Sequence, residues 1–518
     1  MKRLLPLILA VVFLLSGCDL GIPLPTAPEP TETPEPSQYP LPTFRVTEPE
    51  EWAPDDGVFT LRYDLEDTLN PYSCSTEVNR LLCSLLYEPL VDVDAEFRPG
   101  PGISSEWVME DEGRSFLFRL RSGVRFSDGS ALSAWDVIYS INRAMESTSV
   151  YAGRLSVIKD VSLSEDGVRI TLSSRRPGFP CLLDVPIVKE GTAYRDVPEG
   201  TGPYVLERDD AGARLVVNPA SPRAKSLPFD SIALGAFSQE DLPAALTSGR
   251  VDLLISEPGV VSQAGVDGAV RRSVPTTILY YLALNTGSEP LAEPARRRLV
   301  NALINRSLLT GVLGGDATML PLHPLLPEYD EKAARSWLPT DIADYCIEIL
   351  TEDYDEDGML EYFRDGLPTD FTFKLLVCSK NEASTAAARS ISEVLNDNGI
   401  AVELRMLNQT DFLKAVSRRD YDMYLAAMRL TADFDLNALI KAAGNDMMQE
   451  LNERWLCAQS EEEKQAAAYE LCAYTVENSS LIPLVFERRV YYRRQGAAWD
   501  FEPTWTDPFR GMTVRSAD

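Results

Sequence analysis

The sequence predicts an α/β protein of several domains that follows an export signal and an extended stalk. After the first 56 residues, about 460 remain, and by length alone they suggest two to four domains. Hydrophobic residues make up 45% of the chain, which is enough to form substantial cores. Between residues 116 and 145 a strand, a turn and a capped helix are expected to follow one another, so this part of the chain combines strand and helix.

The N-terminus has the pattern of an export signal. A positive start, Met1–Arg3, precedes the apolar run Leu4–Leu15, which is too short to span a bilayer as a helix. The run leads into Ser-Gly-Cys18, and small residues before a cysteine resemble the lipobox of bacterial lipoproteins. We therefore expect residues 1–18 to be a lipoprotein signal and Cys18 to be lipidated, which anchors the protein on the extracytoplasmic face of the cell membrane. An ordinary signal peptide with an unmodified cysteine is the alternative.

Residues 19–56 are predicted to be a disordered linker. They contain ten prolines among Thr, Glu, Ser and Gln, a composition that favours extended conformations over a packed core. The formal net charge of the chain, −30, argues against nucleic-acid binding, because phosphates require Lys and Arg opposite them. The acidity is compatible with a cationic ligand, although solubility alone is a simpler reason for it.

Enzymatic chemistry has few candidates in this chain. The single histidine, His323, excludes a multi-histidine metal site and would have to serve any Ser-His-Asp or Cys-His set by itself. Packing in a proline-rich loop is its simpler role. No GxSxG elbow, phosphate-binding loop or HExxH motif occurs. We expect no enzymatic activity and no cofactor.

Metal-binding patterns are weak. The seven cysteines beyond Cys18 are odd in number and lack CxxC spacing, so we expect scattered buried thiols. Asp353, Asp355 and Asp357 alternate before a glycine, as at the start of a calcium loop. The position that should carry a bidentate glutamate is Arg364, and an acidic turn is the simpler interpretation. We expect no metal, with this loop as a weak calcium candidate.

Local patterns predict several elements directly. A helix is expected from about Thr76 to Leu86, and residues 116–120 alternate as one strand. A second short strand ends at Phe126, and a turn follows at Asp128-Gly129. The next helix begins with a capping box, Ser133 with Asp136. One face of this helix carries Trp135, Ile138, Ile141 and Met145. Residues 311–316 indicate a helix that ends in a turn.

Further motifs form an ordered set from about residue 57 to the C-terminus. They are Leu69-Asn70-Pro71, Tyr87-Glu88-Pro89-Leu90, Phe126-Ser-Asp128-Gly129, Asp136-Val137-x-Tyr139-Ser140, EGTGPYVL (199–206), SGRVDLLI (248–255), the long segment 281–315, NDNGIAVELRML (396–407), RDYDMYLAAM (419–428) and LIPLVFERRVYY (481–492). In this order they resemble the extracytoplasmic solute-binding proteins of family 5. That family includes the dipeptide- and oligopeptide-binding proteins of ABC importers.

The resemblance implies a two-lobed, periplasmic-binding-protein-like α/β fold with an extra inserted α/β domain, three domains in all. Domain I would consist of residues 57–92, 197–274 and 487–518. Domain II would be residues 93–196, and domain III residues 275–486. The hinge would lie near residues 274–286 and near Phe486.

The resemblance also implies a function. We expect a monomeric, lipid-anchored binding protein that captures peptides between its lobes and delivers them to the transmembrane permease subunits of an ABC importer, which a cytoplasmic ATPase drives. A non-peptide ligand (an oligosaccharide, an opine or a metal chelate) is one alternative, and a receptor that senses peptides without import is another. A surface hydrolase is the third.

The resemblance nominates the binding residues as well. Peptide-binding members commonly pair an aspartate in an Ala-Asp-aromatic segment with the free amino group of the peptide, and this segment matches Ala432, Asp433 and Phe434. Capping of the following helix is the alternative role for Asp433, although Asp435 fits it better. Arg429 departs from the family pattern and would favour an anionic group. Other candidates by position are Ser73, Cys74, Ser75, Ile255, Ser256, Glu257 and Asn285.

Overall fold

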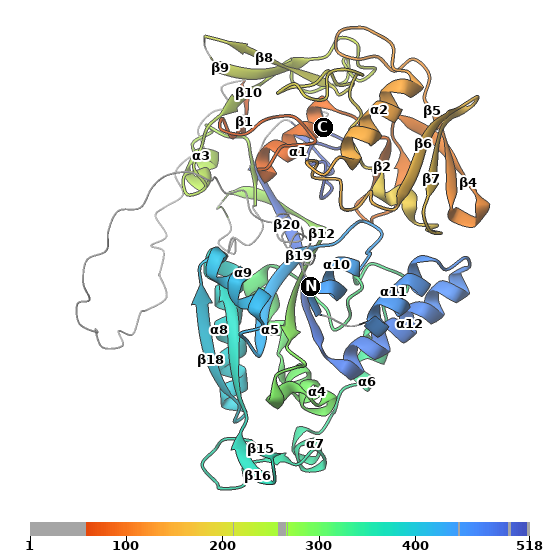
Figure 1. Ribbon diagram of the computed structural model, residues 1–518. Coiled ribbons are helices and arrows are strands. Elements are labelled where there is room, and N and C mark those ends of the chain that lie inside the picture. The colour runs from red at the N-terminus through yellow and green to blue at the C-terminus, as the bar shows by residue number, and fades with distance from the viewer. Residues whose placement is uncertain are drawn as a thin grey trace.

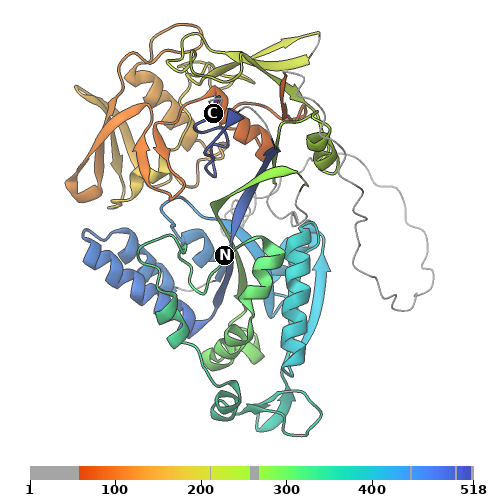
Figure 2. The same cartoon turned by 180° about the vertical axis from the view of Figure 1, so that it is seen from behind.

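The computed structural model describes residues 58–210, 212–256, 266, 268–443, 446–495 and 499–514. These residues form two lobes, which Figure 1 shows one above the other and Figure 2 shows from behind. The upper lobe contains the elements from β1 (Phe59–Arg62) to β11 (Leu253–Ile255), and the lower lobe contains the helices from α4 (Pro294–Leu303) to α12 (Glu461–Asn478). Within the described part of the chain, no helix is both long enough and apolar enough to cross a membrane.

The first part of the upper lobe is a four-stranded sheet in the order β1-β10-β9-β8, in which β1 and β10 are parallel. Helix α1 packs its leucines into the core beside this sheet. These leucines, Leu82, Leu85 and Leu86, recur at helical spacing, and Leu81 is buried as well. The helix ends before Pro89, because the residue preceding a proline disfavours the helical conformation. The elements are β1 (Phe59–Arg62), α1 (Glu77–Leu86), β8 (Tyr204–Asp209), β9 (Gly212–Val217), β10 (Ser231–Gly235), α3 (Leu242–Thr247), β11 (Leu253–Ile255), β21 (Trp499–Asp500) and β22 (Thr513–Val514).

The second part of the upper lobe is an antiparallel sheet in the order β4-β5-β7-β6, with helix α2 beside it. The predicted capping box is present at the start of α2, where the Asp136 carboxylate accepts from the Ser133 backbone N–H at 2.8 Å. A separate hairpin, β2-β3, points toward the lower lobe, where its tip residue Phe97 contacts Phe434. The elements are β2 (Val91–Val93), β3 (Pro99–Pro101), β4 (Ser104–Glu110), β5 (Ser115–Leu120), β6 (Ile158–Ser164), β7 (Gly167–Leu172), α2 (Ala134–Met145), and the 3-10 helices η1 (Asp111–Gly113) and η2 (Phe179–Leu182).

The largest sheet has the strand order β11-β20-β12-β19-β17-β18, and β13 also pairs with β20. Strands β17, β18 and β19 pair in parallel, whereas β12 is antiparallel to both of its neighbours. The strands of this sheet not yet introduced are β12 (Ala269–Leu284), β13 (Gly315–Ala317), β17 (Thr372–Cys378), β18 (Ala401–Leu407), β19 (Met423–Arg429) and β20 (Leu481–Arg494).

Helices cover both faces of this sheet, because its side chains alternate between two cores. Along β12, Tyr280 and Leu282 join the core beneath α4, α5 and α8, whereas Tyr281 and Ala283 join the core that includes α11 and α12. The lower-lobe helices are α4 (Pro294–Leu303), α5 (Arg306–Leu313), α6 (Glu331–Ser336), α7 (Ile342–Glu348), α8 (Glu382–Asp397), α9 (Gln409–Arg418), α10 (Asn437–Ala443), α11 (Asp446–Leu456) and α12 (Glu461–Asn478), with the 3-10 helix η3 (Glu289–Leu291). A small sheet of β14 (Thr351–Glu352), β15 (Glu361–Arg364) and β16 (Leu367–Asp370) lies at the far end of this lobe.

Strands β12 and β20 carry the chain between the lobes (Figure 1). Their pairing shifts register between Pro275 and Leu279, opposite the segment of β20 around Phe486. A β-bulge bends a sheet locally, so this shift marks a natural bending point. It falls where the sequence predicts the hinge. The predicted domain boundaries are compatible with this arrangement and stay a prediction.

Most of the local predictions agree with the structure. Helix α1 matches the predicted helix, and α5 ends at Gly314, whose φ of +70° suits the turn expected there. Two details differ. The segment before Phe126 forms only a single bridge, Arg125 to Ala131, because the turn follows at once. Trp135 is 56% exposed, because it lies in the first turn of α2, although Ile138 and Ile141 on the same face are buried.

Candidate functional site

The candidate site is the interface between the lobes, where charged and aromatic side chains from each lobe meet. Two ion-pair clusters and one aromatic contact span this interface. Each of the three includes a lower-lobe residue from the short segment at the end of β19, between Arg429 and Asp435. The parallel pairing of β17 and β19 places the C-terminal end of β19 at the sheet edge that faces the upper lobe.

The first cluster surrounds Asp433. The Arg176 Nε donates to Asp433 Oδ2 at 2.6 Å, and the Arg176 Nη2 lies 2.8 Å from Asp435 Oδ2. The Thr431 hydroxyl donates to the other oxygen of Asp433 at 2.6 Å. Burial lowers the pKa of Arg176, but the two carboxylates raise it more, so its net shift is upward. Arg176 belongs to the upper lobe, so this buried pair holds the two lobes together.

Asp435 has the capping role that the sequence predicts. Its carboxylate accepts from the Asn437 backbone N–H at 2.8 Å, at the start of α10. Burial raises the pKa of Asp435, but Arg176 and the backbone hydrogen bond lower it more, and the net shift is downward. Asp433 is therefore not the residue that caps this helix.

The second cluster surrounds Glu77 of α1. The Arg429 Nη2 donates to both oxygens of Glu77, at 3.1 and 3.2 Å, and the Arg80 Nη1 donates to Oε2 at 2.9 Å. Arg489 of β20 also donates to this carboxylate and, with its other terminal nitrogen, to the Trp505 carbonyl. One carboxylate thus faces three guanidinium groups, one of which comes from the lower lobe.

The electrostatics of this cluster follow from that imbalance. Burial raises the pKa of Glu77, but Arg429, Arg489 and Arg80 lower it more, so it falls well below its ordinary value. Burial lowers the pKa of Arg429, and the neighbouring charges of Arg80 and Arg489 lower it further, against the influence of Glu77. A second carboxylate, Glu487, lies near the cluster, and burial raises its pKa to about 7. It accepts from the Tyr280 hydroxyl at 3.1 Å.

The third contact is aromatic. Phe97 lies at the tip of the β2–β3 hairpin with a φ of +63°, a conformation that is rare outside glycine. The Asp94 carboxylate accepts from two backbone N–H groups of this turn, those of Glu96 and Arg98, at 2.9 Å each. The Phe97 ring centroid lies 5.1 Å from that of His323 and 5.1 Å from that of Phe434, both in the lower lobe. The predicted site residue Phe434 is therefore buried in an aromatic contact between lobes, at 1% exposure.

The first segment lies next to the Glu77 cluster. Ser73 and Ser75 are exposed, and the Ser75 carbonyl accepts from the Arg80 guanidinium at 3.1 Å. Cys74 is buried, and its Sγ lies 3.5 Å from an oxygen of Asp67, a carboxylate that also accepts from the backbone of Ser75. Cys74 therefore packs within its loop, and its two neighbours are the residues open to a ligand.

Ile255 and Ser256 also lie near Glu77. A small pocket in the upper lobe is lined by these three residues and mainly by leucines otherwise. The Ser256 hydroxyl accepts from the Val490 backbone N–H at 2.8 Å, which ties the end of β11 to β20. Glu257 and Cys18 lie outside the described residues, so their predicted roles stay predictions.

Asn285 lies away from the other candidates. Ile278 of β12 pairs with Arg429, and Asn285 follows seven residues later. In an extended strand this places Asn285 about 23 Å from the position opposite Arg429. Its side chain donates to the Tyr421 carbonyl at 2.9 Å and accepts from the Gly287 backbone N–H. The structure therefore places Asn285 in a turn at the far end of β12 and does not bring it together with the other candidates.

His323 is completely buried, and burial lowers its pKa to about 4. Its Nδ1 accepts from the Leu325 backbone N–H at 3.1 Å. This is the loop-packing role that the sequence favours. The seven cysteines of the described chain are free thiols, and five of them are buried.

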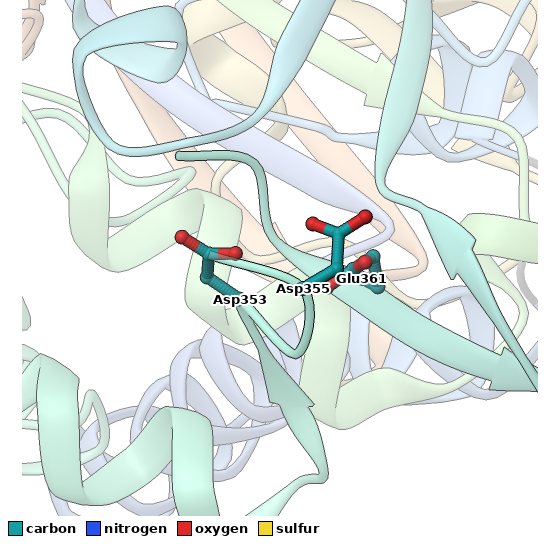
Figure 3. A group of neighbouring side chains, drawn as sticks. All are labelled: Asp353, Asp355 and Glu361. Atoms are coloured by element: carbon teal, nitrogen blue, oxygen red, sulfur yellow. The ribbon is translucent and has the colours of Figure 1, made fainter. Parts of the chain in front are cut away.

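The acidic loop brings together a different set of carboxylates from the predicted one. Asp353, Asp355 and Glu361 each offer an oxygen within 4.8 Å of the others (Figure 3), and Asp357 is not part of this group. Four backbone N–H contacts already occupy the aspartates, among them Gly358 to Asp353 at 2.9 Å and Met359 to Asp357 at 2.8 Å. Glu361 is buried and accepts from the Tyr354 backbone N–H at 2.6 Å. These contacts build the acidic turn, and calcium binding stays a prediction.

Several residues of the interface are absent from the sequence-based candidates, among them Glu77, Arg80, Arg176 and Phe97. Glu77 follows the nominated Ser73–Ser75 segment closely, so extending that segment by two residues would have included it. Neither Arg176 nor Phe97 stands in a motif that signals a binding site.

Comparison with known proteins identifies the family to which this chain belongs. A family model described as "Bacterial extracellular solute-binding proteins, family 5 Middle" matches residues 98–445, which is more than half of the chain. The chain belongs to this family. The glutathione-binding protein GsiB of Escherichia coli O6:K15:H31 is 23% identical to this family 5 chain over 269 residues, which are 47% of the chain and 51% of GsiB. The chain thus spans about half the length of the curated relatives that it matches.

Solved structures have the same fold. The ABC transporter substrate-binding protein CtaP from Listeria monocytogenes is similar with a TM-score of 0.71 and 16% identity, and the match covers 89% of this chain and all of CtaP. NikA from Brucella suis, in complex with Fe(III)-EDTA, is similar with a TM-score of 0.70 and 18% identity over 88% of this chain and all of NikA. This family 5 chain therefore has the two-lobed α/β fold of periplasmic binding proteins.

Proposed function

We propose that this chain is the lipid-anchored substrate-binding protein of an ABC importer, and that it captures peptides between its lobes for delivery to a membrane permease. The observation that carries the proposal is the interface itself. Buried charges of opposite sign face each other across two lobes between which the paired strands β12 and β20 run. Such charges are exposed to solvent and to ligand when the lobes separate, and they are desolvated when the lobes close.

The capture of a peptide uses the pairing between Arg176 and Asp433. The Arg176 guanidinium contacts Asp433 in this structure, and the free amino group of a bound peptide would take its place. A charge-assisted bond between an ammonium and a desolvated carboxylate is stronger than one between neutral groups. Because the peptide then contacts both lobes, it stabilises the closed state by its differential affinity.

A carboxylate-bearing, non-peptide solute is the second candidate. Arg429 supports it, because this guanidinium and those of Arg80 and Arg489 outnumber the two carboxylates near them, Glu77 and Glu487. A site of this composition prefers anions whether or not they belong to a peptide.

Native mass spectrometry of the full chain, purified without refolding, tests the proposal. A spread of added masses that fragment as short peptides is the expected result, and a single discrete non-peptide adduct would favour the second candidate. Import is tested separately by uptake of the bound solute in cells that lack the protein. Loss of uptake is expected, whereas a receptor that only senses the solute would leave uptake unchanged.

A further inference from the structure

The cluster around Glu77 carries more positive charge than its neighbours neutralise. Arg80, Arg429 and Arg489 contribute three cations, and Glu77 contributes one anion. Glu487 is the other carboxylate that acts on these groups. Even with both carboxylates ionised, the cluster keeps at least one unbalanced positive charge in a largely buried place.

The cluster also has unused hydrogen-bond donors. The Nε atoms of Arg80 and Arg429 are buried and have no hydrogen-bond partner. Their side chains nevertheless remain 28% and 18% exposed, whereas that of Arg489 is only 1% exposed. Arg80 and Arg429 can therefore reach a further acceptor, and Arg489 supports the cluster from behind. A guanidinium group presents its donors as a rigid fork that matches a carboxylate.

The two lobes contribute unequally to this cluster. Glu77 and Arg80 are three residues apart on α1, and Arg489 lies in the same lobe, so these three stay together when the lobes separate. Arg429 lies in the lower lobe at the end of β19, and lobe opening takes away its only carboxylate partner among the described residues. An open protein therefore presents Arg429 without a counter-ion.

We infer that Arg429, with Arg80, binds a carboxylate group of the captured solute, and that Glu77 competes with that carboxylate for the same guanidinium groups when the lobes close. This inference rests on the proposed function and names its ligand chemistry. The solute carries at least one carboxylate, which is either the C-terminus or an acidic side chain of a short peptide, or belongs to a small organic acid. It binds Arg429 in the open protein, and closure then brings Arg80 to the same group.

The test uses the solute that is released from the wild-type full chain, before and after methyl esterification, which removes the charge of its carboxylates. We expect the ester to bind wild type at least tenfold more weakly than the untreated solute. Arg429→Gln is expected to bind the untreated solute at least tenfold more weakly than wild type and to lose the discrimination against the ester. Arg405→Gln is the matched control, because Arg405 is an exposed arginine of β18 that pairs with Glu403 away from the interface.

A second variant separates binding from a purely structural role. Glu77→Gln removes the internal competitor and should bind the untreated solute at least as tightly as wild type. If the cluster only held the lobes in place, this variant would bind more weakly. Amino-acid analysis of the hydrolysed solute distinguishes a peptide from another organic acid.

The two proposals fail in different ways. A bound solute whose ester binds as well as the acid would overturn the carboxylate site and leave solute capture intact. A clean unliganded mass after growth in a peptide-rich medium would refute the proposed function, and the carboxylate site with it.

Discussion

Replacement of Arg176 by methionine should open the protein without unfolding it. The substitution keeps the length and the apolar stem of the side chain but leaves Asp433 and Asp435 without their shared cation. Removing one partner of a buried ion pair costs about 3–5 kcal/mol. Here the cost applies only to the closed arrangement, because separation of the lobes returns both carboxylates to water. Even the lower value corresponds to a shift of about a hundredfold in the equilibrium between closed and open forms.

Two measurements report this shift. Small-angle X-ray scattering should give a larger radius of gyration for Arg176→Met than for wild type. The Cys457 Sγ lies 3.0 Å from the Arg175 carbonyl across the interface, so this thiol should be alkylated faster when the lobes separate. A Cys378→Ser background removes the other partly exposed thiol of the described chain. Scattering is needed as well, because Cys457 contacts a neighbour of the substituted residue.

Arg169→Met is the matched control, since Arg169 pairs with Glu110 within the upper lobe and is 40% exposed. It should alter neither measurement. The reasoning would be refuted by an Arg176→Met protein with wild-type dimensions and wild-type alkylation of Cys457. A large fall in thermal stability without any change in dimensions would also refute it, because the pair would then stabilise the fold rather than the closed state.

Four further results are expected. Phe97→Ala should also favour the open form, by about 3–5 kcal/mol from the lost burial of one aromatic ring, and scattering with wild-type dimensions would contradict this. Asp433→Asn should weaken the binding of a peptide with a free amino group by about 1.5–3 kcal/mol in calorimetry, whereas the N-acetylated peptide serves as control and should bind both proteins alike. Burial raises the pKa of Glu487 to about 7 in the folded protein, so the folded protein binds one more proton than the unfolded chain between pH 4.5 and 7, and its stability falls as the pH rises through that window. Glu487→Gln should remove this loss of about 3 kcal/mol. A difference in unfolding free energy between the two proteins that stays constant with pH would disprove this. Cys18→Ala should release the protein from the membrane fraction on cell fractionation, and continued retention would refute the lipid anchor.

The sequence could predict the parts of this protein that depend on neighbours along the chain. The capping box of Ser133 and Asp136 works through contacts three residues apart, and it is present in the structure. The turn at Gly314 needs only a residue that tolerates a positive φ, and the helix ends there as expected. The order of the family motifs predicted the family, and the match of residues 98–445 confirms it. Asp435 was assigned its cap from its place before α10.

The charge pairs of the interface could not be predicted in this way. Arg176 and Asp433 are 257 positions apart, and Glu77 and Arg429 are 352 positions apart. The energy of such pairs depends on how two lobes face each other, which no local pattern contains. Phe97 was missed for the same reason, since its hairpin is unremarkable until the aromatic partners from the lower lobe surround it. The motif around Asn285 indicated its strand but not which end of that strand faces the upper lobe.

The register of β12 and β20 has a consequence for how such proteins diversify. Val274 and Arg489 are direct partners in this pairing, so the segment between them leaves and re-enters the upper lobe at adjacent strands, about 5 Å apart. Recombination at these two positions would therefore replace the whole lower lobe by that of a relative, as one cassette. The ends of the upper-lobe strands that join it would stay where they are. Recombination between relatives could in this way change the face that carries Arg429 and Asp433 while it preserves the lobe that carries Glu77 and Arg176. A new ligand preference then requires only that the incoming cassette place complementary charges at the same edge.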